Sequence, residues 1–323
     1  MSSESARWDA ELAEKTTPAP LLQTWSWGEV QSRAGWSVER VRLPSGAMAS
    51  VQVRSVGPAR DVYVPRGPVP VTSDAIDDLV AWARKRGAAR IVVEPEVTKG
   101  IRTHLKERGF KRTAPTQPQH TRILKLLPPD ELLKTFRHGR RYNIRTGIKR
   151  GVAVEEGKDA AELARQSAAV ERRESIHLPD RRYYELLLEM LPWCRTYTAR
   201  NGDGGEALAT VLVARHGGRA YSLFAGRSGA HRELMGNDLA WWTAIKAAAE
   251  ASCADFDLWG IPPPNSGPAH PWHGLGLFKS EFGGEEVAYV GAWELVISAA
   301  AAGWLKVDSG SRAFIRRLKR NIP

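Results

Sequence analysis

The 323-residue chain contains few of the residues that build metal-bound or disulfide-linked frameworks. Its two cysteines, Cys194 and Cys253, have no Cys or His neighbour at the spacing of zinc ligands, and one pair does not indicate a disulfide framework. We therefore expect no metal site and interpret both thiols as small buried apolar groups. No run approaches about 18 consecutive apolar residues, so we expect no transmembrane helix.

The first 20 residues lack the basic start and the apolar core of a signal peptide. The segment is polar, and its acidic residues are Glu4, Asp9, Glu11 and Glu14. We interpret residues 1–20 as a frayed, flexible leader and expect the protein to be cytoplasmic.

Signatures of several enzyme classes are also missing. The sequence contains no GxSxG motif, P-loop, HExxH motif or Rossmann glycine pattern. Its histidines lie singly, and we interpret His120, His138, His177 and His231 as structural or exposed.

Positive charge is abundant. The net charge is +11, and 42% of the residues are hydrophobic, enough for real cores. Such a field attracts polyanions, whether nucleic acid, anionic lipid surfaces or pyrophosphate-bearing substrates, and does not select among them.

The patterning predicts two α/β units, an interpretation that the chain length also favours. Pro128 and Pro129 mark the entry to the second unit. In the first unit we expect strands up to residue 41 and at 49–55, 62–68 and 90–94, and helices at 27–34, 74–86 (capped by Ser73 or Asp74) and 100–108. In the second unit we expect helices at 130–136, 159–174, 181–190 and 237–251, and strands at 206–216, 218–225 and 254–259.

The densest positive charge lies in residues 134–150. Seven of these seventeen residues are Lys or Arg and none is acidic. One reading is a binding surface for an anionic partner, because arginine binds phosphate with two parallel hydrogen bonds. The other is a solvated helix face balanced by acids elsewhere in the fold.

Two further segments carry chemistry. Glycines are dense from residue 260 to residue 291, which predicts tight turns or the close approach of a ligand. Within that segment Lys279 lies beside Phe278, and a lysine among apolar groups is either functional or a surface lysine with a buried stem. Glu94 ends an apolar strand, either as part of a cleft or as a surface charge.

These segments resemble the Fem family of tRNA-dependent aminoacyltransferases, which form peptidoglycan bridges. The resemblance spans roughly residues 25–293, and it is carried by several short motifs in the family's order. The motifs are Trp25–Gln31 with Gly35-Trp36, Tyr63–Val69, Arg141–Arg145 with Lys149–Val152, Phe224–Gly226, Met235–Asn237, Trp259–Ile261, Phe278-Lys279, Phe282–Gly284 and Tyr289–Gly291.

The resemblance implies an α/β (α+β) fold of two tandem GNAT-like domains, with mixed central sheets flanked by helices. The first domain would comprise residues 1–128 and 292–323, because the last segment returns to it in the family, and the second would comprise residues 129–291. Since no sustained heptad pattern is present, the chain is similar to the short, armless, FemX-like members.

The resemblance also implies an activity. An amino acid would move from aminoacyl-tRNA to an amine of a peptidoglycan precursor, either lipid-linked or nucleotide-linked, without a cofactor. Lys279 matches the family position that stabilises the transition state, and Phe278 lies beside it as a further catalytic candidate. Glu94 is a candidate either for the general base or for a residue that holds the substrate amine. The tRNA phosphates, or the inner face of the membrane, would meet Arg140, Arg141, Arg145 and Lys149. We expect a monomer.

For the precursor, the resemblance implies contacts from a set of polar and aromatic residues. These are Gln31, Arg66, Arg181, Arg182, Tyr183, Tyr184, Phe224 and Trp259. The sequence departs from the family pattern at two diphosphate contacts, because Gln31 or Ser32 stands near an expected lysine and Pro179 at an expected arginine. The alternatives are tRNA-dependent amide formation in antibiotic biosynthesis, acyl transfer from acyl-CoA, and RNA binding without catalysis.

Overall fold

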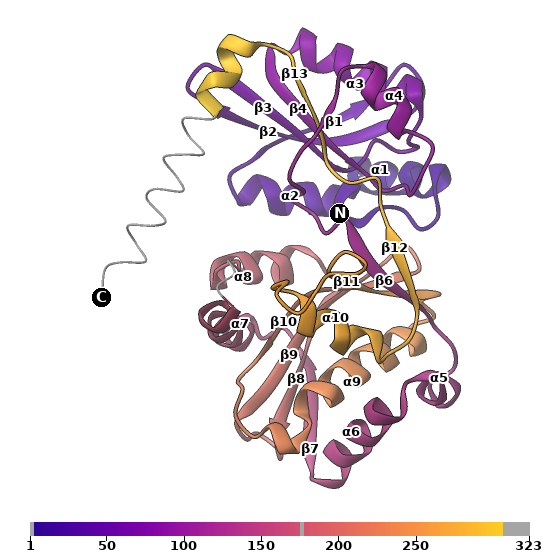
Figure 1. Cartoon of the computed structure of the whole chain (residues 1–323), viewed down its shortest axis with the longest axis vertical. Helices are drawn as coiled ribbons and strands as arrows, with labels where there is room; N and C mark the ends of the chain where they lie inside the picture. The colour runs from indigo at the N-terminus through magenta and orange to yellow at the C-terminus, as the bar shows by residue number, and fades with distance from the viewer. Residues whose placement is uncertain (1–2, 175–177, 306–323) are drawn as a thin grey trace. The chain divides into compact units, whose positions relative to one another are not determined.

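Figure 1 shows the computed structural model, which describes residues 3–174 and 178–305. Contacts within the chain divide it into two units, one comprising Met1–Gln119 with Tyr289–Pro323 and the other His120–Ala288. Phe314, Ile315 and Leu318, within a basic run, predict a short amphipathic helix from the sequence, but these residues lie outside the described part of the chain. Within the described ranges, no helix has both the length and the apolar character that a bilayer crossing requires.

The first unit contains a six-stranded sheet in the order β1-β2-β3-β4-β13-β5. Strands β3 and β4 are parallel and the other pairs are antiparallel. The strands are β1 (Ser37–Arg42), β2 (Met48–Val56), β3 (Ala59–Arg66), β4 (Ala88–Pro95), β5 (Lys111–Arg112) and β13 (Trp293–Val296). The helices are α1 (Ser3–Lys15), α2 (Trp25–Arg33), α3 (Ser73–Lys85) and α4 (Arg102–Glu107).

Helix α3 connects the parallel strands and packs on the sheet through one apolar stripe. Ala75, Ile76, Leu79 and Ala83 recur at helical spacing, and all four are fully buried. The N-cap is Thr72, whose side chain accepts from the Ala75 backbone N–H at 3.1 Å, so the predicted caps at Ser73 and Asp74 were wrong by one or two residues.

The N-terminal segment is not a frayed leader, and that expectation was wrong. Residues Ser3–Lys15 form α1, which buries Trp8 and Leu12 completely. The Trp8 indole N–H donates to the Gln23 carbonyl at 2.9 Å. The physical reason is a narrow stripe of buried positions on a helix whose other faces carry the acids that dominate the composition.

The second unit contains a seven-stranded sheet in the order β12-β6-β11-β10-β9-β8-β7. Its strands are β6 (His120–Lys125), β7 (Val152–Gly157), β8 (Cys194–Asn201), β9 (Ala207–His216), β10 (Arg219–Arg227), β11 (Asp255–Gly260) and β12 (Glu285–Ala288). Its helices are α5 (Pro129–Thr135), α6 (His138–Lys149), α7 (Ala160–Glu174), α8 (Arg181–Met190), α9 (Gly236–Glu250) and α10 (His273–Ser280). We assigned residues 120–128 to the first domain, but β6 pairs with β11 and β12 in this second sheet.

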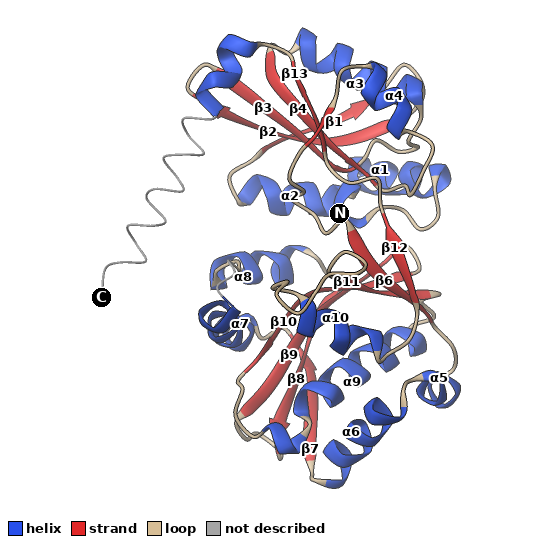
Figure 2. Cartoon of the chain, viewed as in Figure 1, coloured by secondary structure: helices blue, strands red, loops and turns tan. Residues whose placement is uncertain are grey.

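Helix α9 connects the parallel strands β10 and β11 and forms the centre of the second core. It is apolar on most sides because the sheet covers one face and α6 packs on another, so Trp241, Ala244 and Ile245 are all buried. Figure 2 shows α7 on the opposite face of the same strands.

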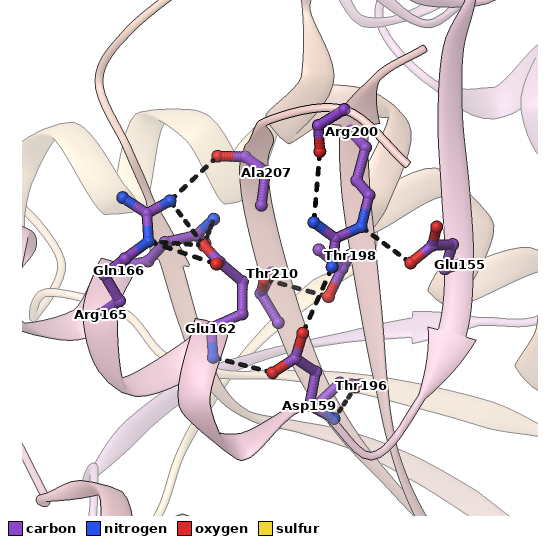
Figure 3. A network of polar contacts seen from close by, with 11 residues as sticks. Glu155, Asp159, Glu162, Arg165, Gln166, Thr196, Thr198, Arg200, Ala207 and Thr210 are labelled. Atoms are coloured by element: carbon purple, nitrogen blue, oxygen red, sulfur yellow. Dashed lines mark hydrogen bonds and ion pairs between the residues drawn. The ribbon is translucent and has the colours of Figure 1, made fainter. Parts of the chain in front are cut away.

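A polar network anchors the start of α7 to β8 (Figure 3). The Asp159 backbone N–H donates to Thr196 Oγ1 at 2.9 Å, and the Asp159 carboxylate accepts from the Glu162 backbone N–H at 2.8 Å and from Arg200 at 3.4 Å. Beneath it, the buried hydroxyls of Thr198 and Thr210 form a hydrogen bond of 3.1 Å. These bonds fix the first turn of a helix that packs against β9 and β10.

The glycine-rich segment was expected to form tight turns or a site of close ligand approach, and no helix was predicted there, but His273–Ser280 forms helix α10. Gly276 is required there by packing, since a Cβ atom would lie 2.7 Å from the Pro262 ring. Glycine lowers intrinsic helix stability, so tertiary contacts decide the conformation of this segment.

Candidate active site

The candidate site of the second unit lies where two parallel strands separate. Pairing between β10 and β11 covers Arg219–Tyr221 and Asp255–Asp257 and ends there. Beyond that point Trp259 adopts a left-handed backbone conformation, with φ of 60°, next to Gly260. The carboxyl ends of parallel strands that diverge leave backbone groups unpaired within the sheet, which is where α/β folds bind ligands.

Asp257 fixes this turn from within the sheet. Its side chain is buried, and Oδ1 accepts hydrogen bonds from the Trp259 backbone N–H at 2.7 Å and from the Thr121 hydroxyl. The first bond supports the left-handed residue and directs the Gly260 carbonyl toward α10. Neither Asp257 nor Thr121 was predicted as a site residue, although an acid within the apolar run of β11 is a usable signal.

Lys279 extends from α10 to this turn. Its side chain is buried, with 5% of the residue exposed, and Nζ donates to the Gly260 carbonyl at 2.8 Å. Burial lowers the pKa of Lys279 from 10.5 to about 7, and the charge of Asp257 opposes this shift. The ammonium also lies 5.7 Å from the centre of the Trp241 ring. Lys279 is therefore a buried amine that exchanges its proton near neutral pH.

Aromatic rings surround the helix that carries this lysine. Phe278 packs edge-on against Trp241 and Phe282, with ring centres 5.6 Å and 5.4 Å apart. Phe136 of the segment after α5 contacts Phe282 in the same way at 5.2 Å. This packing excludes water on the α10 side and keeps Lys279 in an apolar environment.

Arg140 holds the same helix from α6. Its guanidinium is buried, lies 4.1 Å above the Phe278 ring, and donates to the Phe278 carbonyl at 2.9 Å. Ion pairs join it to Asp238 of α9 and, at 3.1 Å, to Glu281. Since burial withdraws Arg140 from solvent, the prediction that it contacts tRNA phosphates was wrong.

The other three predicted phosphate contacts remain on the surface of the second unit. Arg145 and Lys149 are exposed, and Arg141 is half-buried. Arg141 donates to the carbonyls of Phe136 and, at 3.3 Å, Lys134. The fold thus separates Arg140 from the basic residues that neighbour it in sequence.

Three predicted substrate residues form one aromatic cluster on the other side of the sheet. Tyr184 is buried, its ring meets Phe224 at 5.2 Å, and its hydroxyl bonds to Ser167 of α7 at 3.1 Å. Burial raises the pKa of Tyr184 to about 12. Tyr183 is half-buried and reaches Phe224 at 6.3 Å.

The Trp259 ring lies edge-on to Tyr221, with ring centres 6.0 Å apart. The predicted arginines of α8 do not join the aromatic cluster. Arg181 and Arg182 are both exposed, and Arg181 pairs with Glu185 one turn further along the helix at 2.6 Å.

In the first unit, Glu94 is enclosed instead of ending its strand at the surface. Only 2% of the residue is exposed, and its carboxylate accepts from the Tyr63 hydroxyl at 2.7 Å. It also accepts from the backbone N–H groups of Thr116 at 2.5 Å and Gln117 at 3.0 Å. Three donors therefore bind a side chain that we predicted as a general base, and they tie the loop after β5 to β4.

Arg66 and Gln31 are also largely enclosed in the first unit. Arg66 is buried with φ of 55°, donates to the Pro118 carbonyl at 2.7 Å, and lies 4.3 Å from the centre of the Tyr289 ring. Gln31 lies on α2 with 7% of the residue exposed. Arg66 and Glu94 both fasten the segment that ends at Gln119.

Similar proteins define the class of fold. Residues 134–270 match the family model of the acetyltransferase (GNAT) domain. A tandem GNAT protein from the clavulanic acid biosynthesis pathway has a TM-score of 0.55 at 13% identity, over 91% of this chain and 96% of that chain. The chain therefore has a tandem GNAT fold of mixed sheets and flanking helices, which confirms the predicted fold class.

Two further similarities concern the Fem proteins. The crystal structure of FemX matches with a TM-score of 0.79 at 20% identity, over 92% of this chain and 97% of that chain. Lipid II:glycine glycyltransferase of Staphylococcus haemolyticus is 29% identical over 205 residues, which are 53% of this chain. The match spans about half of that relative, 47% of its length. The resemblance to the Fem family that the motifs predicted is thus confirmed.

Proposed function

We propose that this protein is a Fem-type aminoacyltransferase, which moves an amino acid from aminoacyl-tRNA to an amine of a peptidoglycan precursor. The observation that carries the proposal is the buried Lys279 against Gly260 at the end of the diverging strands, within a fold similar to FemX. The relative from Staphylococcus haemolyticus supports the acceptor, because its name specifies glycyl transfer to lipid II.

The reaction is an ester aminolysis. The amine nitrogen attacks the carbonyl carbon of the aminoacyl ester, a C–N bond forms, and the bond from carbon to the ribose oxygen breaks. The attacking nitrogen loses a proton and the ribose oxygen gains one, so protons balance without a further reactant. Because the ester is already activated, this step needs no ATP.

Lys279 is the candidate cation for the oxyanion that forms during attack. An ammonium has three N–H donors, so it can keep its bond to the Gly260 carbonyl and still face a developing negative oxygen. Loss of one such donor lowers the rate by about 10²–10³ in other enzymes. The aromatic packing of Phe278 and Trp241 strengthens this charge interaction because it excludes water.

The experiment that tests this function supplies the full chain with radiolabelled aminoacyl-tRNAs, a lipid-linked precursor and a nucleotide-linked precursor. We expect label to move from one class of tRNA to a precursor amine, and Lys279→Met to slow this transfer about 100-fold or more. Transfer from acyl-CoA instead of tRNA, or no transfer at all, would contradict the proposal.

A second candidate is the same chemistry with a small amine as acceptor, as in natural-product biosynthesis. Its support is the pair of departures from the family pattern, Gln31 and Pro179, at positions where a lysine and an arginine are expected to bind the precursor diphosphate. Label that moves to small amines, but to neither precursor, would select this alternative.

A further inference from the structure

One surface of the second unit exposes large apolar side chains among its lysine and arginine residues. Tyr142 is 60% exposed and Ile148 is 59% exposed, the highest values among the large hydrophobic residues of the described chain. Both belong to α6, whose sequence contains no acid. Solubility accounts for the exposed basic side chains of this segment, but it does not account for an exposed isoleucine among them.

The helical period explains why these residues face outward. Helix α6 buries Arg140, Ile144 and Gly147, and a Cβ atom on Gly147 would lie 3.5 Å from Leu239 Cβ of α9. Residues on the opposite face recur three and four positions apart. We call this surface the α6 basic face, defined by Lys134, Arg137, Arg141, Tyr142, Arg145, Ile148, Lys149 and Arg150.

The α6 basic face also contains a hollow. It has a volume of about 490 Å³ and is lined by Asp130, Leu133, Lys134, Arg141 and Arg145. Three cations face one acid in this hollow, so it suits an anionic group such as a phosphate. Among the described residues, neither Arg145 nor Lys149 forms an ion pair, so these charges are not neutralised within the fold.

We propose that the α6 basic face docks on an anionic phospholipid bilayer, with headgroup phosphates at its cations and with Tyr142 and Ile148 at the boundary between headgroups and acyl chains. The proposal rests on the proposed function, because a lipid-linked acceptor is located at such a surface. Basic helices with outward apolar side chains bind membranes in this way.

A lipid surface fits better than a nucleic acid for one reason. Phosphate contacts from Arg145 and Lys149 would serve either partner, and a tyrosine can stack on an unpaired base. Ile148 offers a nucleic acid neither charge nor an aromatic ring, whereas a lipid boundary buries its apolar area. The 59% exposure of Ile148 is therefore the observation that separates the two partners.

The test measures binding of the full chain to phosphatidylcholine vesicles with and without phosphatidylglycerol. Arg145→Ala with Lys149→Ala should weaken binding to the anionic vesicles about 25-fold, since each basic side chain near such a surface contributes about fivefold. Tyr142→Ser with Ile148→Ser should weaken it about tenfold at unchanged charge. The matched control is Arg102→Ala with Lys106→Ala, which removes the same charge from exposed positions of α4 in the first unit.

Binding of tRNA, measured with the same variants, provides the second readout. We expect the apolar double variant to bind tRNA as the wild type does while its affinity for anionic vesicles falls. Unchanged vesicle binding in both α6 variants, or an equal loss in the α4 control, would overturn the proposal. Because these assays measure binding and not amino acid transfer, a failure of the docking proposal can be distinguished from a failure of the proposed reaction.

Discussion

Arg140 of α6 donates a hydrogen bond of 2.9 Å to the backbone carbonyl of Phe278, the residue that precedes Lys279. Asp238 pairs with the other terminal nitrogen of the guanidinium, and Glu281 pairs at 3.1 Å with the nitrogen that donates to Phe278. The segment that is most basic in the sequence therefore contains a buried support for the helix that carries the candidate catalytic lysine. Arg140 is a positioning residue, and the exposed arginines beside it have a different role.

The first prediction concerns this support. Arg140→Ala should lower the free energy of unfolding by about 3–5 kcal/mol, because it leaves the Asp238 carboxylate without its ion pair. Transfer should fall mainly in kcat, with little change in the salt dependence of KM for tRNA. Arg145→Ala on the exposed face is the control, and it should change stability by about 0.5 kcal/mol or less.

Urea denaturation of both variants measures this difference. Equal stability of the Arg140 and Arg145 variants would show that the buried contacts carry no net energy. If Arg140→Ala instead strongly changed the salt dependence of KM for tRNA, Arg140 would be a residue that contacts tRNA phosphates.

The second prediction follows from the burial of Lys279. The pKa of Lys279 falls from 10.5 to about 7, so between those pH values the unfolded chain binds more protons and stability rises with pH. Below about pH 7 the buried amine is protonated in the folded state, so the full free-energy cost of burying its charge is present. Lys279→Met removes this cost and loses one hydrogen bond to Gly260, so it should stabilise the fold by on the order of 2 kcal/mol at pH 6.

Urea denaturation of the wild type and Lys279→Met at pH 6 and pH 10 tests this. The stability difference should be largest at the acid end and should close toward pH 10. A difference that does not vary with pH would mean that the pKa of Lys279 is not lowered by folding.

The third prediction concerns the pH dependence of transfer. If the ammonium of Lys279 stabilises the oxyanion, kcat/KM should fall above neutrality with an apparent pKa of about 7. Lys279→Arg keeps a positive charge at every accessible pH. Its activity should be lower because the geometry differs, but the decline above pH 7 should disappear. An unchanged decline in Lys279→Arg would assign that titration to another group.

The fourth prediction concerns Glu94, whose oxygens accept from Tyr63, Thr116 and Gln117. Glu94→Gln replaces one acceptor by an N–H₂ group that faces a donor, so it should destabilise the protein by about 1–3 kcal/mol. Turnover at saturating substrate should fall less than tenfold. A loss of several hundredfold without loss of stability would restore the predicted general base.

Much of the fold could be predicted because its elements carry strong local signals. The α3 stripe follows the helical period, and β4 and β9 are apolar runs of strand length. The structure contains all three within a few residues of the expected bounds. The strands that were not predicted are β5, β6, β7, β8, β12 and β13. For β12 and β13 the reason is that each has four residues and that their partners β6 and β4 lie far away in sequence. Helix α10 was not predicted either, because packing of Gly276 on Pro262 overrides weak propensity.

The candidate site was predictable in part. Lys279 could be predicted because it is a lysine with an apolar neighbour. Its hydrogen-bond acceptor, the Gly260 carbonyl, could not, because the position of that carbonyl depends on the turn that Asp257 fixes. The density of positive charge identified residues 134–150 as a candidate binding segment. It did not distinguish the buried face of the helix from the exposed face. The helical period would have separated Arg140 from Arg145, because Arg140 shares a face with Ile144 and Gly147.

The last prediction concerns α1, whose residues were predicted from the sequence to form a flexible leader. Trp8 is fully buried, its indole donates to the Gln23 carbonyl, and Arg42 lies 5.5 Å from its ring centre. Trp8→Ala should therefore destabilise the protein by about 3–5 kcal/mol, as expected for loss of a large buried aromatic side chain. Arg7→Ala, one position earlier and exposed, should change stability by about 0.5 kcal/mol or less. Thermal and urea denaturation of both variants would measure the contrast, and equal stability would mean that α1 does not contribute to the folded core.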